Sequence, residues 1–152
     1  MNIRLATLDD AKSMDKLNRL EMPENYPISF WNIILSDQWN SSFVAHNDQG
    51  ELVGYILTIS EYNFLNFSRQ AHIISFTVKS AYRKKNIAKE LLKSSLNHVK
   101  NCHGIQSCTL NVRVDNEIAL HLYTQFGFII NERKTAYYND GTDAFGMYKN
   151  LE

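Results

Sequence analysis

The sequence predicts a single α/β domain built on a mixed, largely antiparallel sheet. Three observations support this fold class. Strand-like and helix-like segments follow one another along all 152 residues in the order β-α-α-β-β-β-α-β-α-β-β. Residues 42–60 have the pattern of a hairpin with a glycine-ended turn. Residues 71–78 form a strand that runs through a cationic loop into a long helix, and we expect a short parallel section of the sheet there.

The chain begins with a predicted strand and a predicted helix. Residues 2–6 alternate between polar and apolar side chains, as a half-buried strand does. Thr7 precedes two acidic residues and is the expected N-cap of a helix that reaches about Glu21. The side chains that share one face of this helix are Met14, Leu17 and Leu20 or Glu21.

Two prolines interrupt the chain after this helix. The residue before a proline is pushed toward extended backbone, so Pro23 and Pro27 exclude a regular helix between them. We expect a shaped loop here and a second helix that begins at Ser29, with an apolar stripe of Phe30, Ile33 and Ile34. The two helices carry more apolar positions than one face can bury, and some are expected to meet a partner: Met14, Leu17, Phe30, Trp31, Ile34 and Leu35.

The middle of the chain predicts three strands. Residues 42–46 and 52–60 are the arms of the hairpin, joined by the turn 47–50. Residues 62–69 are polar with interspersed aromatic side chains, and we expect them to form an irregular connection. Residues 71–78 are the fourth strand of the chain.

The C-terminal half predicts two helices and three strands. A helix-period run at 89–100 leads into a strand at 105–112. A helix at 116–125 ends at a glycine, another strand begins at Phe128, and a last strand spans 144–149. No linker or internal repeat divides the chain, so residues 1–152 are expected to form one domain.

The composition excludes several classes of protein. Sixteen basic residues balance sixteen acidic ones, so no overall field would collect nucleic acid or an anionic membrane. The start lacks a signal peptide's apolar core and no apolar run could span a bilayer, so we expect an intracellular, soluble protein. Cys102 and Cys108 have no zinc-site spacing and the histidines are scattered, so we expect no metal.

The cationic loop is the most informative segment. Helix N-termini carry unsatisfied N–H groups and positive dipole charge, so an anion that binds there gains both hydrogen bonds and a favourable field. Asn86 tolerates left-handed backbone better than any residue except glycine, and small Ala88 lets a pyrophosphate approach the chain. The loop therefore predicts a site for a nucleotide-type cofactor, formed by Arg83, Lys84, Lys85, Asn86, Ile87 and Ala88.

This loop resembles the acyl-CoA loop of the GNAT N-acetyltransferase superfamily, Arg/Gln-x-x-Gly-x-Gly/Ala, with Asn86 in place of the usual glycine. Residues 116–123, Asn-Glu-Ile-Ala-Leu-His-Leu-Tyr, followed by Gly127-Phe128, resemble the second signature, Asn-x-x-Ala-x-x-x-Tyr with Gly-Phe. The resemblance implies a GNAT fold with about four helices, seven strands and a splayed fourth and fifth strand. It also implies acetyl-CoA as cosubstrate, with pantetheine against the backbone of Phe76, Thr77 and Val78.

A closer resemblance covers residues 1–151. The segments 23–26 (Pro-Glu-Asn-Tyr), 121–123 (His-Leu-Tyr) and 137–144 (Tyr-Tyr-Asn-Asp-Gly-Thr-Asp-Ala) resemble the subfamily of catalytic subunits of N-terminal acetyltransferase complex A. The resemblance implies acetyl transfer to the α-amino group of nascent polypeptides by direct attack in a ternary complex. It further implies a cytoplasmic enzyme that a helical-repeat auxiliary subunit holds at the ribosome.

Acetyl transfer needs a neutral amine, a polarised thioester oxygen and a proton for the leaving thiolate. Glu24 in the proline-bracketed loop and His72, expected to face the splay, are the candidate bases; relatives often carry histidine where this chain has Asn111. Tyr123 is the candidate acid, and Asn116, two helical turns earlier, is expected to project from the same face toward the cofactor. The expected walls of the peptide slot are Pro23, Tyr26, Arg113, Tyr137 and Tyr138.

Three other functions stay open at this point. A bacterial-type ribosomal-protein alanine acetyltransferase shares both cofactor motifs, although segments 23–26 and 137–138 favour the complex A type. A catalytically silent acetyl-CoA-binding subunit is the second alternative, because Asn86 and Asn111 depart from the pattern. The third, a small-molecule amine acetyltransferase, gains no support from the neutral overall charge.

Overall fold

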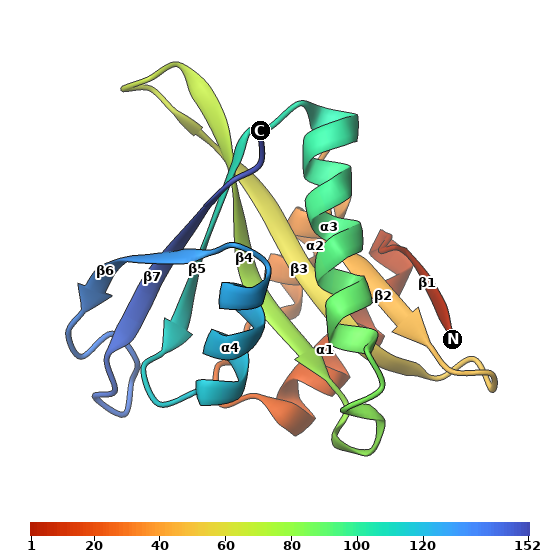
Figure 1. Cartoon of the computed structure of the whole chain (residues 1–152). Helices are drawn as coiled ribbons and strands as arrows, with labels where there is room; N and C mark the ends of the chain where they lie inside the picture. Colours follow the sequence, from red (N-terminus) through yellow and green to blue (C-terminus); the bar gives the residue numbers. More distant parts are fainter.

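The computed structural model describes residues 1–152 as one seven-stranded sheet of order β1-β2-β3-β4-β5-β7-β6 with helices on both faces (Figure 1). The strands are β1 (Asn2–Leu5), β2 (Phe43–His46), β3 (Leu52–Asn63), β4 (Ser68–Val78), β5 (Ser107–Arg113), β6 (Ile129–Lys134) and β7 (Ala144–Asn150). The α-helices are α1 (Ala11–Glu21), α2 (Ile28–Ser36), α3 (Ile87–His103) and α4 (Glu117–Gln125). The predicted fold class is confirmed.

Two apolar cores lie on opposite faces of the sheet, one under α3 and α4 and the other under α1 and α2 (Figure 1). Successive side chains of a strand point to opposite faces, so β3 contributes to both cores. Ile56 packs in the core that contains Leu91 of α3, whereas Tyr55 packs in the core that contains Trp31 of α2. The sheet is therefore covered on both sides.

The parallel pairing of β4 with β5 is short. It consists of Ala71 with Cys108, His72 with Thr109 and Ile73 with Leu110, while every other strand pair is antiparallel. A bulge at Ile74 of β4 follows at once. Beyond it the two strands diverge, with α4 in front of the gap (Figure 1). The backbone groups of residues 74–78 that face β5 thus have no neighbouring strand to bind.

The β3–β4 hairpin is longer than the sequence indicates. Residues 62–69 were expected to be irregular, yet β3 runs to Asn63 and β4 begins at Ser68. Two asparagine side chains close the turn between them: Asn63 Oδ1 accepts from the N–H of Leu65, and Asn66 Oδ1 accepts from the N–H of Ser68. Such Asx turns let a polar segment form a tight reversal. The expectation of an irregular connection was therefore wrong for both ends of the segment.

The first two helices differ in detail from the expectation. A capping box between Thr7 and Asp10 initiates a short 3-10 turn (Leu8–Asp10), and α1 begins after it. Pro27, not Ser29, caps α2, whose buried positions are Trp31, Ile34 and Leu35. Ile33 is 70% exposed and Leu20 is 67% exposed.

The predicted partner positions on these helices are core instead. Met14, Leu17, Trp31, Ile34 and Leu35 are buried, and Phe30 packs against them. The indole N–H of Trp31 donates to Asp15, which turns that ring inward. The prediction of an external surface was wrong for these residues, because the sheet accepts apolar side chains from both helices at once.

Candidate active site

The loop between β4 and α3 has the conformation that an anion site needs. Asn86 adopts left-handed backbone with φ 64°, as predicted, and Lys84 does so with φ 62°. The N–H of Glu90 makes the first helical hydrogen bond, to the carbonyl of Asn86, and no side chain caps the helix. The first N–H groups of α3 therefore point into the loop without an intrahelical partner. This arrangement fits a pyrophosphate.

Arg83 holds this loop in place rather than extending from it. Its Nε donates to the carbonyl of Val78 at 3.0 Å, and its guanidinium meets the Glu21 carboxylate at 3.0 Å. Glu21 also accepts hydrogen bonds from the N–H and hydroxyl of Ser80. Burial raises the pKa of Glu21, but these hydrogen bonds and Arg83 outweigh it and leave the pKa below its usual value. Arg83 is exposed as well but ion-paired, so the loop cations without a carboxylate partner are Lys84 and Lys85.

Helix α4 places Tyr123 beside the diverging strands. Tyr123 is 8% exposed, and its ring lies 6.2 Å from that of Phe76 on β4. Its hydroxyl makes no hydrogen bond to the protein, and burial raises its pKa, so the phenol is protonated at neutral pH. Asn116 caps α4 by accepting from the N–H of Ala119, which uses its oxygen and leaves its amide N–H groups without a partner. Tyr123 thus lies beside the diverging strands, whereas the side chain of Asn116 also caps α4.

On the opposite face of the sheet, three separate elements meet at Arg113 of β5. Its Nε lies 3.2 Å from Oε1 of Glu24 in the α1–α2 loop. Its terminal nitrogen lies 2.8 Å from Asp140 in the β6–β7 loop, and its guanidinium stacks over Tyr138 at 4.3 Å. Glu24 Oε2 is buried and has no hydrogen-bond partner. One carboxylate oxygen is thus held by an ion pair, while the other has a vacant acceptor position.

Aromatic rings surround this carboxylate. Tyr26 stacks on Phe30 with ring centres 4.8 Å apart, and Tyr137 meets Tyr138 edge-on at 5.0 Å. Burial and the charge of Glu24 raise the pKa of Tyr138 to about 12, and the same two causes raise the pKa of Tyr26. Pro23 is exposed beside Glu24. The structure therefore brings together all five residues that were expected to form the peptide slot.

The sequence from residue 11 to residue 128 matches the model of the acetyltransferase (GNAT) family. The chain belongs to this family. The acetyltransferase is 37% identical over 151 residues to an N-alpha-acetyltransferase of Sulfurisphaera tokodaii, covering 95% of this chain and 90% of that protein. It is 32% identical to an Arabidopsis thaliana protein described as the catalytic subunit of the N-terminal acetyltransferase A complex, covering 99% and 78% of the two chains. The predicted resemblance is confirmed.

A solved structure agrees over the whole chain. A chain of the NatC complex bound to Gag peptide and CoA superposes with a TM-score of 0.92 at 25% identity, covering 99% of the acetyltransferase and 98% of that chain. The acetyltransferase uses acetyl-CoA as cosubstrate, and its loop at α3 and the open edge of β4 are the features that suit this molecule. It has no cluster of three side chains that could hold a metal ion, and no helix long and apolar enough to cross a bilayer.

His72 of the acetyltransferase does not face the splay. It lies in the paired stretch of β4, opposite Thr109, and its Nδ1 is 2.8 Å from the Thr109 hydroxyl. Burial lowers its pKa, so the imidazole is neutral at pH 7. This position differs from the expected one because the strands separate only after Ile73.

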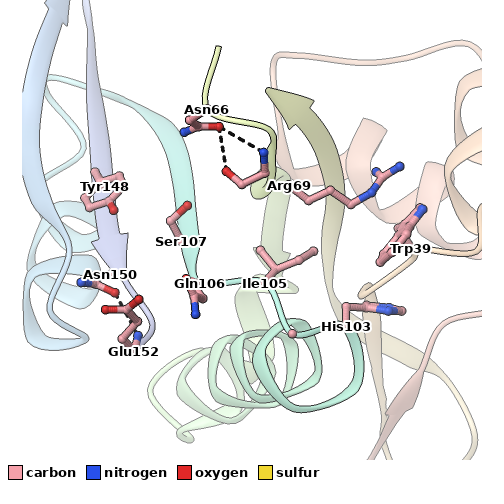
Figure 2. Close-up of a pocket in the computed structure, with 12 residues that line it drawn as sticks. Trp39, Asn66, Arg69, His103, Ile105, Gln106, Ser107, Tyr148, Asn150 and Glu152 are labelled. Carbon is pink, nitrogen blue, oxygen red and sulfur yellow. Dashed lines mark hydrogen bonds between the residues drawn. The ribbon is translucent and has the colours of Figure 1, made fainter. Parts of the chain in front are cut away.

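The site is an open gap between strands rather than an enclosed cavity. A hollow of about 480 Å³ lies elsewhere, between Trp39, the start of β4, the α3–β5 loop and the C-terminus (Figure 2). Arg69 stacks over Trp39 at its rim, 4.0 Å from the ring centre. This hollow shares no residue with the predicted site.

Two residues of the site were absent from the sequence-based set. The sequence assigns Asp140 only to the segment 137–144 that carries the resemblance, and Glu21 only to the last turn of a helix. Both carboxylates acquire a specific partner far along the chain, Arg113 for Asp140 and Ser80 for Glu21. Nothing local in the sequence distinguishes them from solvated charges. The signal that comes nearest is the pair of tyrosines that precedes Asp140.

Proposed function

We propose that this chain transfers acetyl from acetyl-CoA to the α-amino group of a polypeptide N-terminus by direct attack in a ternary complex. The observation that carries the proposal is the buried, unpartnered Oε2 of Glu24, held beside the gap between β4 and β5. An ionised carboxylate oxygen without a hydrogen bond is costly to bury unless a ligand completes it. A substrate ammonium group supplies both the charge and the donor that this oxygen lacks.

Each step has a group from this chain. Glu24 takes the proton of the amine, whose pKa near 8 requires only modest help at neutral pH. Backbone N–H groups of β4 beyond Ile73 polarise the thioester oxygen, because no strand occupies that edge. Tyr123 gives its proton to the leaving thiolate. We assign His72 no direct proton transfer, since its Nδ1 already shares a hydrogen bond with the Thr109 hydroxyl.

The substrate that fits the slot is a free peptide N-terminus. Tyr26, Tyr137 and Tyr138 form apolar walls with polar ends, which hold a first residue without reading distant sequence. We propose that the natural substrates are nascent polypeptides, met in the cytoplasm at the ribosome. We also propose a helical-repeat auxiliary subunit; the Arabidopsis relative is described as the catalytic subunit of a complex.

The test is CoA release by the purified chain with matched peptides that begin with Ser, Ala, Asp, Glu or Met-Leu. Turnover is expected with small or acidic free N-termini and none with an acetyl-blocked control. Glu24→Gln is expected to lower kcat by about 100-fold, and Tyr123→Phe by a similar factor, because each removes a proton-transfer group.

Other outcomes separate the alternatives. Binding of acetyl-CoA without turnover on any peptide would contradict the proposal and favour a silent subunit. Acetylation of polyamines but not of peptides would favour a small-molecule acetyltransferase. Turnover confined to peptides that begin with Ala would favour a ribosomal-protein alanine acetyltransferase.

A further inference from the structure

A buried asparagine connects the loop that carries Glu24 to the sheet. Asn18 on α1 is fully buried. Its Nδ2 donates to the Tyr55 hydroxyl at 3.0 Å, and the Tyr55 hydroxyl lies 2.7 Å from that of Ser75. On its other side, Asn18 Oδ1 accepts from Nδ2 of Asn25 at 3.0 Å. Four polar side chains therefore form one continuous chain of hydrogen bonds.

The two ends of this chain lie at the proposed site. Asn25 directly follows Glu24, and its Nδ2 also donates to the carbonyl of Met22 at 3.0 Å. Ser75 directly follows the bulge at Ile74, where β4 leaves its pairing with β5. A line of hydrogen bonds thus runs from the base of the splay to the residue beside Glu24.

Burying a polar network costs free energy, which indicates that the network around Asn18 has a specific role. An apolar side chain at position 18 would lie beside the buried Leu17 and Met14 without any polar group to satisfy. A satisfied buried network instead fixes one geometry, because each member loses its partner if the loop shifts. A second contact acts in parallel: Trp31 meets Tyr55 at 5.5 Å and Tyr26 at 6.0 Å, both edge-on.

We infer that Asn18 is a positioning residue, which sets the distance between Glu24 and the splayed part of β4 through Asn25 on one side and Tyr55 and Ser75 on the other. The inference rests on the proposed role of Glu24. Without this link the α1–α2 loop keeps the ion pair between Glu24 and Arg113. It is then no longer held at a fixed distance from β4, the strand proposed to bind the thioester.

The experiment uses Asn18→Leu, which retains the branched shape of the side chain, and Asn25→Ala, which removes only the loop side of the link. Each is expected to lower kcat about tenfold, since small displacements of a catalytic group are costly. The KM for acetyl-CoA is expected to stay within about twofold, because neither Asn18 nor Asn25 bonds the cofactor loop, which α1 contacts through Glu21 instead. The double variant is expected to have the same kcat as either single variant, since both substitutions break the same connection between the loop and β4.

Ser95→Ala is the matched control. Ser95 is as fully buried as Asn18, and its hydroxyl bonds Thr58 and the carbonyl of Ser41, in a network that does not reach the loop. It is expected to lower the melting temperature with kcat unchanged. An equal loss of kcat in this variant would overturn the inference, as would additive losses in the Asn18 and Asn25 pair.

Asn25→Ala decides the matter even if Asn18→Leu fails to fold, because Asn25 is at the surface. A folded Asn25→Ala protein with unchanged kcat contradicts the inference. Adding Asn25→Ala to Glu24→Gln is expected to cause no further loss. If Glu24→Gln alone leaves kcat unchanged, the role of Glu24 is refuted, and this result is separate from the coupling between Asn18 and Asn25.

Discussion

Glu24 has two carboxylate oxygens in different surroundings, and this difference defines its role. Oε1 is held by Arg113, whereas Oε2 is buried without a partner. The charge of the carboxylate is therefore stabilised from one side while its basic lone pairs remain available on the other. The different surroundings of the two oxygens arise because the α1–α2 loop, β5 and the β6–β7 loop meet at this point.

Arg113→Gln removes the ion pair and is expected to lower kcat about tenfold, because the carboxylate loses its orientation. Steady-state kinetics with a Ser- or Glu-initial peptide would measure this. Arg133→Gln is the control, since Arg133 makes a similar contact with Asp143 at 2.9 Å on β6, away from Glu24. Equal losses of kcat in Arg113→Gln and Arg133→Gln would show that kcat depends on surface charge in general and not on the ion pair with Glu24.

Sequence patterns found the residues of the site that belong to recognisable segments. Glu24 and Tyr26 lie in one motif, and Tyr137 and Tyr138 lie in another. Asn18 was not found, because a polar residue on a helix is usually solvated and only its depth in the fold shows otherwise. Contacts between positions 18, 55 and 75 cannot be read from any local spacing.

At the scale of elements, the loop before α3 combines left-handed backbone at Asn86 with an uncapped helix start. Asn86→Gly is expected to bind CoA within about threefold of the original affinity, since glycine adopts this conformation without strain. Asn86→Val is expected to weaken binding about tenfold, because left-handed backbone costs an ordinary residue roughly 1–2 kcal/mol.

Isothermal titration of CoA would measure both affinities, with circular dichroism to verify that α3 remains folded. Equal affinities for the glycine and valine variants would show that the backbone conformation at this position does not matter for binding.

The β4–β5 ladder contains the half-buried His72, whose pKa is lowered in the folded chain by burial; Glu61 opposes this shift and Lys134 adds to it. The unfolded chain therefore takes up this proton more readily. Stability from this group is complete above about pH 6.5 and is lost as the pH falls through that value toward the lower, folded pKa.

Urea unfolding at pH 7.5 and pH 5.5 would detect the effect. The free energy of unfolding is expected to fall between these two pH values, and to fall less in His72→Gln. The exposed His121→Gln is the control and is expected to behave as the original chain. If the free energy of unfolding of His72→Gln falls between pH 7.5 and pH 5.5 by as much as that of the original chain, the acid sensitivity belongs to other groups.

The order and type of the elements were predictable from apolar periodicity, but the bounds of one hairpin and the buried face of one helix were not. The β3–β4 hairpin extends through Tyr62 and Arg69, whose sequence is polar, because side chains of Asn63 and Asn66 close its turn. The buried face of α2 is rotated from the predicted one, since Trp31 packs against Tyr55 on the face of β3 that α2 covers. A local turn decided the first case, and a tertiary contact decided the second.

On the scale of the whole molecule, apolar side chains remain on the outside of the first two helices. Leu20 is 67% exposed and Ile33 is 70% exposed. Leu20→Glu combined with Ile33→Glu is expected to leave peptide turnover by the isolated chain unchanged and to abolish co-purification with the proposed auxiliary subunit. Lys16→Glu on the same helix is the control. Unchanged co-purification of the double variant would place the interface elsewhere.

The divergence of β4 and β5 also bears on the order of events in a catalytic cycle. The features that suit acetyl-CoA lie with α3 and α4 on one face of the sheet, and those that suit the peptide lie beside Glu24 on the other. Neither product then has to pass through the space that the other occupies. The acetylated peptide and free CoA can leave by separate exits, so the sheet itself imposes no compulsory sequence of release.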